Sequence, residues 1–227
     1  TIVPPSATAG RSFDGIDIAD PVRWGVLGMA DIARRAVIPA IDAVPDAHLH
    51  AVATRRAAPE GEFGGAAARV YSGPGAYEAL LADPAVEAVY VPVPNHLHSY
   101  WVARAAEAGK HVLCEKPLGV SPSDVSNMCK IAERCGVLLM EAFMYRYNPQ
   151  HRRVRELVRS GKLGTVRLFQ GSFTVALDRP DDNIRMVSEP GAGALFDVGI
   201  YPINTARWMF DALPTNAYAN ALRRDSS

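Results

Sequence analysis

The feature that most constrains the fold of this chain is an alternation of short apolar runs with segments of helical pattern. The apolar runs are Val22–Leu27, His48–Ala53, Val86–Val93, His111–Cys114 and Val137–Glu141. Buried strands of a parallel sheet read as continuous apolar runs, and each pair of parallel strands needs a crossover helix. The alternation through Glu141 therefore predicts an α/β fold with a doubly wound parallel sheet.

The segments between these runs carry helix signals. Helices are expected at Gly28–Ile41, Tyr77–Leu81, His98–Ala108 and Ser121–Cys135. The last is the most sharply bounded, because Ser121 is a good N-cap, Pro122 suits the first helical position and Gly136 suits the stop.

The pattern changes near Asn148. A helix is expected at His151–Gly161, and Thr165–Thr174 alternates polar and apolar residues as a half-covered antiparallel strand does. We therefore divide the chain into a loosely ordered arm (1–21), a first domain (22–148) and a second domain (149–227).

Composition narrows the class of partner. Of 227 residues, 48% are hydrophobic, and Lys plus Arg equals Asp plus Glu at 24 each. No basic field favours nucleic acid, and no apolar stretch is long enough to span a bilayer. The 3 cysteines contain no CxxC pair, which argues against a disulfide framework and a zinc site. We expect a soluble cytoplasmic protein with a small-molecule partner.

A phosphate-binding turn is expected after the first strand. Gly28, Ala30 and Ala33 match the spacing G-x-G-x-x-G/A, with alanine at the second and third places. Small residues there allow a tight turn, a close backbone approach to pyrophosphate and close helix packing. The match alone is weak, and an ordinary strand-to-helix turn explains it equally well.

The end of the second strand bears on the choice of dinucleotide. An acidic residue there would bind the ribose 2′-hydroxyl of NAD, but the chain has Thr54, Arg55 and Arg56. A hydroxyl followed by arginines suits the 2′-phosphate of NADP. We favour NADP over NAD, against the alternative of a solvated loop.

Polar residues follow two further strands. Asn95 and His98 come after the third strand, where we expect them to line the nicotinamide end of a cofactor; the alternative for Asn95 is helix capping. A metal site at His96 and His98 is disfavoured because no third ligand is nearby. Lys116, in Glu115-Lys116-Pro117, follows the fourth strand and is expected to point into the crevice, where it could bind a substrate oxygen.

A second chemical stretch lies near the carboxyl end. The glycine-rich start at Gly191 leads into a helix through Phe210, on which Asp197 and Tyr201 are four residues apart and so share one face. They form a candidate acid/base pair. The alternative is that Tyr201 packs its ring and Asp197 caps the helix.

Together these motifs resemble the glucose-fructose oxidoreductase / inositol dehydrogenase (Gfo/Idh/MocA) family. The resemblance rests on motifs that occur in the family's order: Gly28-x-Ala30-x-Ile32-Ala33, Pro94-Asn95-His96-Leu97-His98, Glu115-Lys116-Pro117, Glu141-Ala142-Phe143-Met144-Tyr145-Arg146, and Gly193-Ala194-Leu195-x-Asp197-x-Gly199-x-Tyr201-Pro202.

The resemblance implies a Rossmann domain followed by an α+β domain with an open, mainly antiparallel sheet that mediates homo-oligomer formation. It places the family's active-site lysine at Lys116 and its aspartate and acid/base positions at Asp197 and Tyr201. It adds Ile32 and Glu115 to the cofactor-binding residues. A tyrosine at position 201 is similar to the dihydrodiol dehydrogenase, xylose dehydrogenase and antibiotic-sugar 3-ketoreductase branches.

The implied activity is NADP-dependent hydride transfer to or from a carbon of a sugar or cyclic polyol. The alternatives are a nucleotide-linked 3-keto-sugar reductase of a biosynthetic pathway and a non-catalytic NAD(P)-binding regulator. We expect Lys116, Arg146, Asp197 and Tyr201 to contact the substrate, with Arg146, Arg152 and Arg153 keeping a diphosphate-bearing substrate open. Family members are longer, so the second domain is expected to be truncated, and the chain, which lacks an initiator methionine, is a fragment, a split product or a reduced form.

Overall fold

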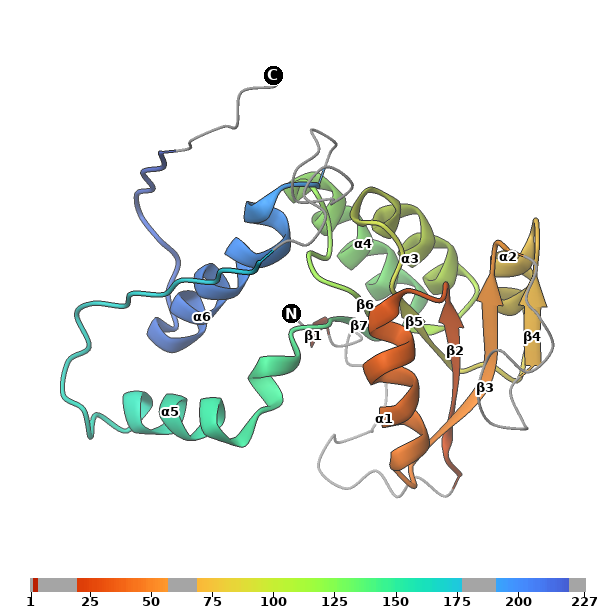
Figure 1. Cartoon of the computed structure of the whole chain (residues 1–227), viewed down its shortest axis with the longest axis horizontal. Coiled ribbons are helices and arrows are strands. Elements are labelled where there is room, and N and C mark those ends of the chain that lie inside the picture. Colours follow the sequence, from red (N-terminus) through yellow and green to blue (C-terminus); the bar gives the residue numbers. More distant parts are fainter. Residues whose placement is uncertain (1, 4–19, 57–68, 177–190, 221–227) are drawn as a thin grey trace.

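The computed structural model in Figure 1 describes residues 2–3, 20–56, 69–176 and 191–220. Its strands are β1 (Ile2–Val3), β2 (Val22–Leu27), β3 (Ala47–Thr54), β4 (Arg69–Ser72), β5 (Ala88–Val91), β6 (His111–Cys114) and β7 (Leu139–Glu141). Its α-helices are α1 (Ile38–Ala43), α2 (Ala76–Ala82), α3 (His98–Glu107), α4 (Pro122–Cys135), α5 (Pro149–Arg159) and α6 (Ile200–Phe210). π-helical turns at Ala33–Val37 and Leu195–Gly199 lead into α1 and α6, and 3₁₀ turns lie at Asn95–Leu97 and Met144–Tyr147.

The strands form a 7-stranded sheet in the order β1-β7-β6-β5-β2-β3-β4. From β2 to β7 every pairing is parallel, and β1 pairs antiparallel with β7. The chain winds outward from β2 in one direction through β3 and β4, and in the other through β5, β6 and β7. This is the Rossmann arrangement, with its switch point between β2 and β5. The prediction of a doubly wound parallel sheet is confirmed.

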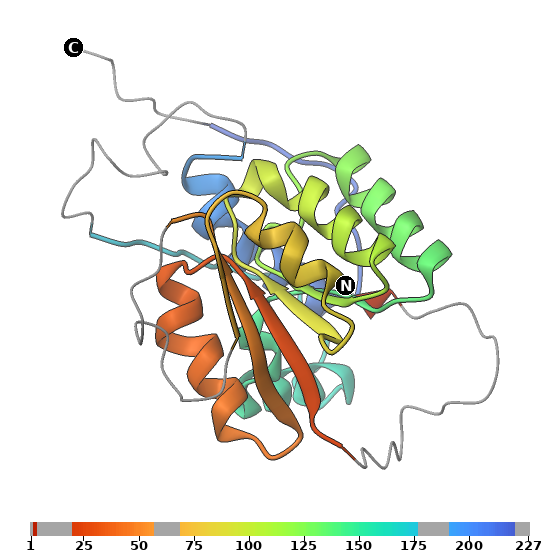
Figure 2. The same ribbon diagram turned by 90° about the vertical axis from the view of Figure 1, so that its right-hand side faces the viewer.

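Helices cover both faces of the sheet, as Figure 2 shows, with α1 on one face and α2, α3 and α4 on the other. Successive residues of β2 supply the two cores, because side chains of a strand alternate between faces. Val26 packs in the cluster that contains Ala33 and Ile41, and Leu27 packs in the larger cluster that contains residues of α2, α3 and α4.

The boundaries of α4 follow the sequence signals. The Ser121 hydroxyl accepts a hydrogen bond of 3.2 Å from the backbone N–H of Asp124, and Gly136 ends the helix with φ of 68°. A left-handed conformation at this position is easy only for glycine. The helix expected at Ser121–Cys135 is therefore confirmed, together with its caps.

Two short strands were not predicted. β1 lies inside the segment expected to be a loose arm, where Ile2 pairs with Met140 and Val3 with Leu139. β4 pairs with the end of β3. Its sequence, Arg69–Ser72, contains only two apolar residues, Val70 and Tyr71, which is too short a run to indicate a strand. Backbone pairing at a sheet edge needs no apolar run, so neither strand leaves a clear pattern in the sequence.

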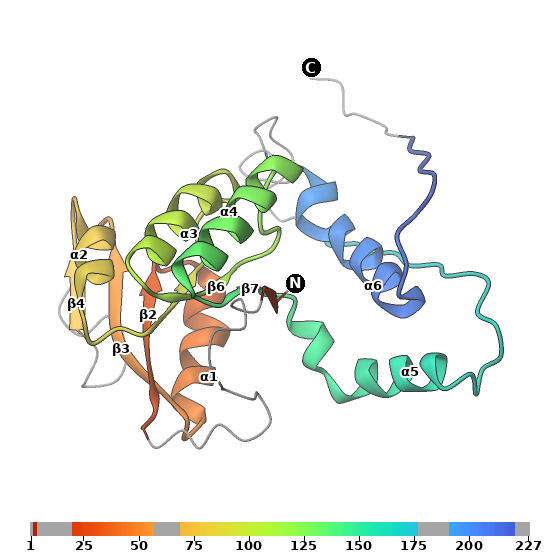
Figure 3. The ribbon, with the colours of Figure 1, turned by 180° about the vertical axis from the view of Figure 1, so that it is seen from behind.

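The second part of the chain differs from the expectation. Figures 1 and 3 show α5 and α6 lying beyond the β7 end of the sheet. Thr165–Thr174 is not a strand, and Leu168 is 71% exposed. The predicted strand is wrong here because an alternating segment becomes a strand only beside a partner, and the described residues contain no such partner for it.

Among the described residues, each helix is too short or too polar to cross a lipid bilayer.

Candidate active site

The predicted site residues gather at one edge of the sheet because parallel strands end on the same side. Gly28 follows β2, Thr54 ends β3, and Lys116 follows β6. Asn95 lies in the turn between β5 and α3. The start of α6 reaches this edge from the other part of the chain.

Lys116, which follows β6, and Asp197, which lies just before α6, form a close ion pair. The Lys116 Nζ lies 2.9 Å from Asp197 Oδ1 and donates a 2.7 Å hydrogen bond to the Asp197 carbonyl oxygen. Their side chains are 13% and 20% exposed. An ammonium has three N–H donors, so these two contacts leave a third for a substrate oxygen.

Tyr201 lies one helical turn beyond Asp197 and faces the same lysine. The Lys116 Nζ is 5.2 Å from the centre of the Tyr201 ring. The ring stacks on Phe173 at 5.2 Å and meets the edge of Phe143 at 5.6 Å. Burial raises the pKa of Tyr201 to about 12, with further contributions from the charges of Glu115 and Asp197. The phenol is therefore protonated at neutral pH.

A buried tyrosine, Tyr90, fixes the position of the Glu115 carboxylate. The Tyr90 hydroxyl donates a 2.7 Å hydrogen bond to Glu115 Oε1, and the backbone N–H of Lys116 donates to Glu115 Oε2 at 3.2 Å. Tyr90 is fully buried, and this burial raises its pKa. Tyr90 thus holds the carboxylate that precedes the candidate active-site lysine.

His98 lies next to the expected region, at the start of α3, but its side chain points inward. It is fully buried, with Nδ1 2.8 Å from the Pro117 carbonyl oxygen and Nε2 2.9 Å from that of Val93. Burial lowers the pKa of its imidazole. The side chain therefore braces the turn at Lys116–Pro117, whose peptide bond is cis, and does not line an open surface.

Asn95 ties the sheet edge to the segment that leads into Asp197. Its Nδ2 donates a 2.6 Å hydrogen bond to the Gly191 carbonyl oxygen, and the turn at Asn95–Leu97 has no side-chain cap. Gly191 has φ of 78°, and a Cβ there would lie 2.3 Å from Val120 Cγ1. Only glycine allows this close approach.

The turn after β2 has the features of a phosphate cradle. Gly28 has φ of 102°, donates to the Ala53 carbonyl oxygen at 2.8 Å, and would place a Cβ 2.7 Å from the Tyr77 hydroxyl. Ala33 is buried against the sheet, whereas Ala30 is half-buried and Ile32 is exposed. The turn is therefore tight, and its outer rim is open.

The residues expected to select the cofactor lie beside this turn. Thr54 is buried, and its Oγ1 accepts from the backbone N–H of Arg56 at 3.3 Å, while the side chains of Arg55 and Arg56 are exposed. Burial raises the pKa of Tyr77, and nearby Arg55 partly offsets the rise. Arg55 and Tyr77 thus flank the Gly28 turn.

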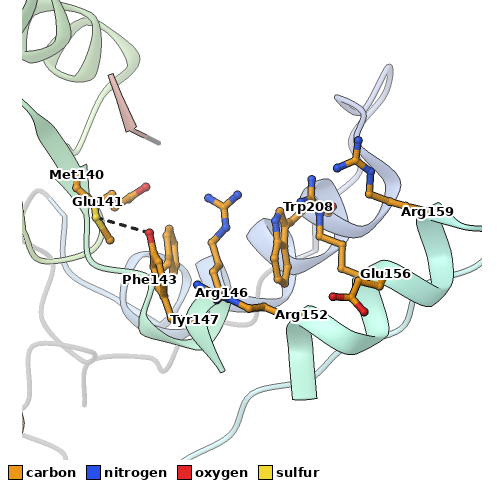
Figure 4. A pocket seen from close by; sticks show the side chains of 10 residues that line it. Met140, Glu141, Phe143, Arg146, Tyr147, Arg152, Glu156, Arg159 and Trp208 are labelled. Atoms are coloured by element: carbon orange, nitrogen blue, oxygen red, sulfur yellow. Dashed lines mark hydrogen bonds between the residues drawn. The ribbon is translucent and has the colours of Figure 1, made fainter. Parts of the chain in front are cut away.

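Arg146 lies apart from the pair formed by Lys116 and Asp197. It lines a cavity of about 500 Å³ bounded by the end of β7, the turn after it, α5 and α6 (Figure 4). Its guanidinium lies 5.2 Å from the centre of the Trp208 ring.

Three aromatic residues near the site belong to no motif that indicates a functional role: Tyr77, Tyr90 and Trp208. Each is an aromatic residue in a strand or helix, which normally indicates core packing. For the two tyrosines the available signal was the phenol hydroxyl, because a buried Tyr O–H usually needs a polar partner. In the described part of the chain, no three His, Cys, Asp or Glu side chains cluster as metal ligands would.

Family models match both parts of the chain. Residues 22–143, more than half of the sequence, match the oxidoreductase family with an NAD-binding Rossmann fold, and residues 151–227 match the GFO/IDH/MocA C-terminal domain. The chain belongs to the GFO/IDH/MocA oxidoreductase family. The resemblance inferred from its motifs is confirmed.

Several GFO/IDH/MocA relatives are named for reactions on sugars. The chain is 42% identical to a dTDP-3,4-didehydro-2,6-dideoxy-alpha-D-glucose 3-reductase from Actinomadura kijaniata, over 83% of this chain and 56% of the relative. It is 41% identical to D-xylose 1-dehydrogenase (NADP(+)) 2 from Haloferax volcanii, over 86% and 59%. A solved 3-ketoreductase from Actinomadura kijaniata, in complex with NADP and TDP-benzene, matches with a TM-score of 0.74 and 42% identity, over 84% of this chain and 58% of that one.

The chain thus spans less than 60% of the length of these GFO/IDH/MocA relatives.

Proposed function

We propose that this chain belongs to an NADP-dependent oxidoreductase that transfers a hydride between the nicotinamide and a carbon of a sugar or cyclic polyol. The observation that carries the proposal is the convergence of Lys116, Asp197 and Tyr201 at the carboxyl edge of the parallel sheet. The division into a cofactor-binding domain (22–148) and a substrate and oligomerisation domain (149–227) is part of the same proposal.

The residues at the Gly28 turn fit a dinucleotide phosphate. A positive φ at Gly28 and the absence of a Cβ allow close approach of the backbone, and Arg55 with Thr54 stands where a 2′-phosphate would lie. Gly28, Ala30, Ile32 and Ala33 would hold the pyrophosphate side, and Asn95, Glu115 and Lys116 the nicotinamide side. NADP, when bound, supplies or accepts the hydride.

The protein side chains then account for the proton. In the direction of carbonyl reduction, Lys116 holds the substrate oxygen and stabilises the negative charge that develops on it, and the Tyr201 hydroxyl donates its proton to that oxygen. Asp197 fixes the ammonium through two contacts. Because the pKa of Tyr201 is raised to about 12, the protonated form needed for this step predominates at neutral pH.

The test is turnover by the chain with a panel of aldoses, inositols and keto sugars, followed by the absorbance of the reduced cofactor. We expect NADP-linked turnover on at least one sugar or polyol, and its loss in Tyr201→Phe with NADP binding retained. Tight NADP binding without turnover on any member of the panel would instead support a non-catalytic regulator.

A nucleotide-linked keto sugar is the second candidate substrate. Two observations favour it: the identity to sugar-nucleotide 3-reductases, and the arginine-lined cavity near Arg146. Turnover of a dTDP-linked 3-keto sugar with a kcat/KM above that of every free sugar would rank it first.

A further inference from the structure

The cavity beside Trp208 is lined by several arginines and has no part in the proposed hydride transfer. It has a volume of about 500 Å³ and adjoins a second cavity of about 300 Å³. The two share Arg146, Arg155 and Trp208 in their walls. Ligand sites typically enclose about 300–1,000 Å³, so the pair is large enough for a small organic ligand.

The walls carry more positive than negative charge. Together the two cavities are lined by Arg146, Arg152, Arg155, Arg159, Arg207, Glu141, Glu156 and Asp211. Two of the three carboxylates are engaged elsewhere: Glu141 accepts a 2.8 Å hydrogen bond from the Leu118 N–H, and Glu156 pairs at 3.0 Å with Arg153, which lies outside the walls. The five guanidiniums are thus only partly neutralised.

The guanidiniums are held in place before any ligand arrives. Arg155 donates through Nε to the Trp208 carbonyl oxygen at 3.1 Å and lies 5.0 Å from the centre of the Trp208 ring. Arg152 donates through Nε to the Arg146 carbonyl oxygen at 3.3 Å and lies 5.1 Å from the Tyr147 ring centre. These hydrogen bonds and ring contacts use Nε and the planar face. The Nη2 atoms of Arg155 and Arg159 each lie 3.7 Å from the Asp211 carboxylate, which is longer than a hydrogen bond, so a phosphate oxygen could still compete for their N–H groups. Figure 4 shows Arg146, Arg152 and Arg159 arranged around Trp208.

The cavity is separated from Tyr201 by an aromatic wall. The Phe143 ring, in the cavity lining, meets the edge of Tyr201 at 5.6 Å, and the Tyr145 ring lies between Tyr201 at 6.1 Å and Trp208 at 5.9 Å. A ligand in the cavity would therefore touch the packing that positions Tyr201 without occupying the place of the reacting carbon.

We propose that this arginine cavity binds the phosphate groups of a small molecule. Several planar guanidinium forks around one concavity suit the bidentate recognition of a phosphate or diphosphate. A nucleic acid is a poorer match, because Lys plus Arg equals Asp plus Glu over the whole chain and the arginines line a hollow. The phosphate belongs either to the tail of a nucleotide-linked substrate or to a separate phosphorylated effector.

The first experiment measures binding of inorganic pyrophosphate to the whole chain by calorimetry at low ionic strength, without any turnover. We expect a saturable site with Kd below about 1 mM, weakened by added salt. Arg155→Gln should weaken binding at least about tenfold, since it removes a charge-assisted contact. Lys162→Gln is the control, because it removes one positive charge from an exposed residue just after α5 that lines neither cavity, and should change Kd less than about twofold.

Arg152→Gln is a second variant, in case Arg155→Gln unfolds the chain through the lost contact to the Trp208 carbonyl. Absence of saturable binding in the native chain, or equal weakening by Arg152→Gln and Lys162→Gln, would overturn the proposal, since diffuse surface charge would then explain any attraction.

A second experiment distinguishes the two sources of phosphate. If pyrophosphate raises the KM for a dTDP-linked keto sugar but not for a free sugar, the cavity holds the substrate's diphosphate. If it binds without competing with either substrate, the ligand is a separate effector. Both results require the site, and because the binding measurement needs no catalysis, failure of the proposed hydride transfer would leave the cavity independently testable.

Discussion

At the scale of single residues, the candidate site is organised by one ammonium group. Lys116 is held by the side chain and the backbone of Asp197, and its own backbone N–H is bonded by Glu115, which Tyr90 fixes in turn. Each contact restricts where the charge can lie. Preorganised charge of this kind stabilises a transition state without reorganisation at the moment of reaction.

Replacing Lys116 with methionine should separate binding from chemistry. We expect kcat to fall about 10²–10⁴-fold, because both the oxygen contact and the positive charge are lost. NADP affinity, measured by fluorescence titration, should stay close to that of the native chain. The exposed Lys130→Met on α4 serves as the control for loss of one lysine. If Lys116→Met turned over at the rate of the native chain, the lysine would have no role in the chemical step.

Replacing Arg55 with alanine should change cofactor preference. One charge-assisted phosphate contact is worth about 1.5–3 kcal/mol, so NADP affinity should fall roughly ten- to a hundredfold. NAD affinity should be unchanged, because NAD has no 2′-phosphate, and NAD titration is the internal control. Equal losses of affinity for both cofactors would mean that Arg55 supports the fold of the turn and does not discriminate between NADP and NAD.

The raised pKa of Tyr201 gives a prediction about pH. If the neutral phenol donates the proton, Tyr201 should stay protonated until pH approaches about 12, where the phenolate forms, so loss of the phenol proton should not limit carbonyl reduction at the ordinary tyrosine pKa. An unperturbed tyrosine would lose activity around its ordinary pKa of about 10. The pH–rate profile tests this, with the phenolate absorbance of native and Tyr201→Phe protein compared in parallel. A decline in rate that is centred near pH 10 and tracks phenolate formation would contradict the assignment.

At the scale of elements, the sequence predicted what is buried and periodic. Val22–Leu27 and His111–Cys114 are strands with the expected ends, and α4 has the expected caps. The edge strands β1 and β4 escaped detection because pairing at an edge depends on backbone contacts from distant residues. At Thr165–Thr174 the reverse happened, since the alternating pattern is present but the described residues contain no partner strand for it.

The candidate site also contains residues that the sequence predicts and residues that it does not. Lys116, Asp197 and Tyr201 carry local signals and are brought together by the fold, whereas the role of Tyr90 depends on Glu115, 25 residues later in the chain. His98 sits next to the expected region but is turned inward, which the sequence cannot reveal because a helix start presents both buried and open sides. Contacts of this kind follow from tertiary packing and not from a motif.

The segment before α6 gives a prediction with a matched pair of glycines. Gly191→Ala would meet Val120 Cγ1 at 2.3 Å and Asn95 Cβ at 3.0 Å, in addition to the cost of a left-handed conformation. Gly193 has φ of 90° but nothing within 4 Å, so Gly193→Ala carries only the conformational cost of about 1–2 kcal/mol. We expect Gly191→Ala to lower the melting temperature more and to reduce kcat by displacing Asp197. Equal melting temperatures for the two variants would show that the contact with Val120 relaxes freely.

At the scale of the whole molecule, the edge of the sheet opposite the site is held by a charged cluster. The buried Asp83 carboxylate accepts from Arg69 at 2.9 Å, from Tyr71 at 2.9 Å and from the Ala85 N–H at 2.9 Å. Lys110 is also buried and donates to the carbonyl oxygens of Asp83 and Val86 at 2.7 and 2.8 Å. This cluster joins β4 to the turns that precede β5 and β6.

The Asp83 cluster should make stability depend on pH in the acid range. The Ala85 N–H, followed by Tyr71 and Arg69, lowers the pKa of Asp83 below its ordinary 3.8. The ionised carboxylate therefore contributes fully to the free energy of unfolding above its ordinary pKa. This contribution is lost as pH falls through the lower pKa of the folded state. Asp83→Asn should be less stable than the native chain in urea at pH 7, and the difference should shrink below pH 4. A difference that does not change with pH would show that the carboxylate charge contributes nothing.

The bond between Lys116 and Asp197 joins residues 81 positions apart, and between them the chain passes through the mostly exposed stretch at Thr165–Thr174, where Phe173 stacks on Tyr201. A cut in that stretch would break no described strand or helix, yet would put the two halves of the site on separate polypeptides. Reassociation of the halves would then be reported by catalysis itself. If the proposed hydride transfer holds, this stretch is a place to divide the chain so that activity returns only when two fused partner proteins bring Lys116 and Asp197 together again.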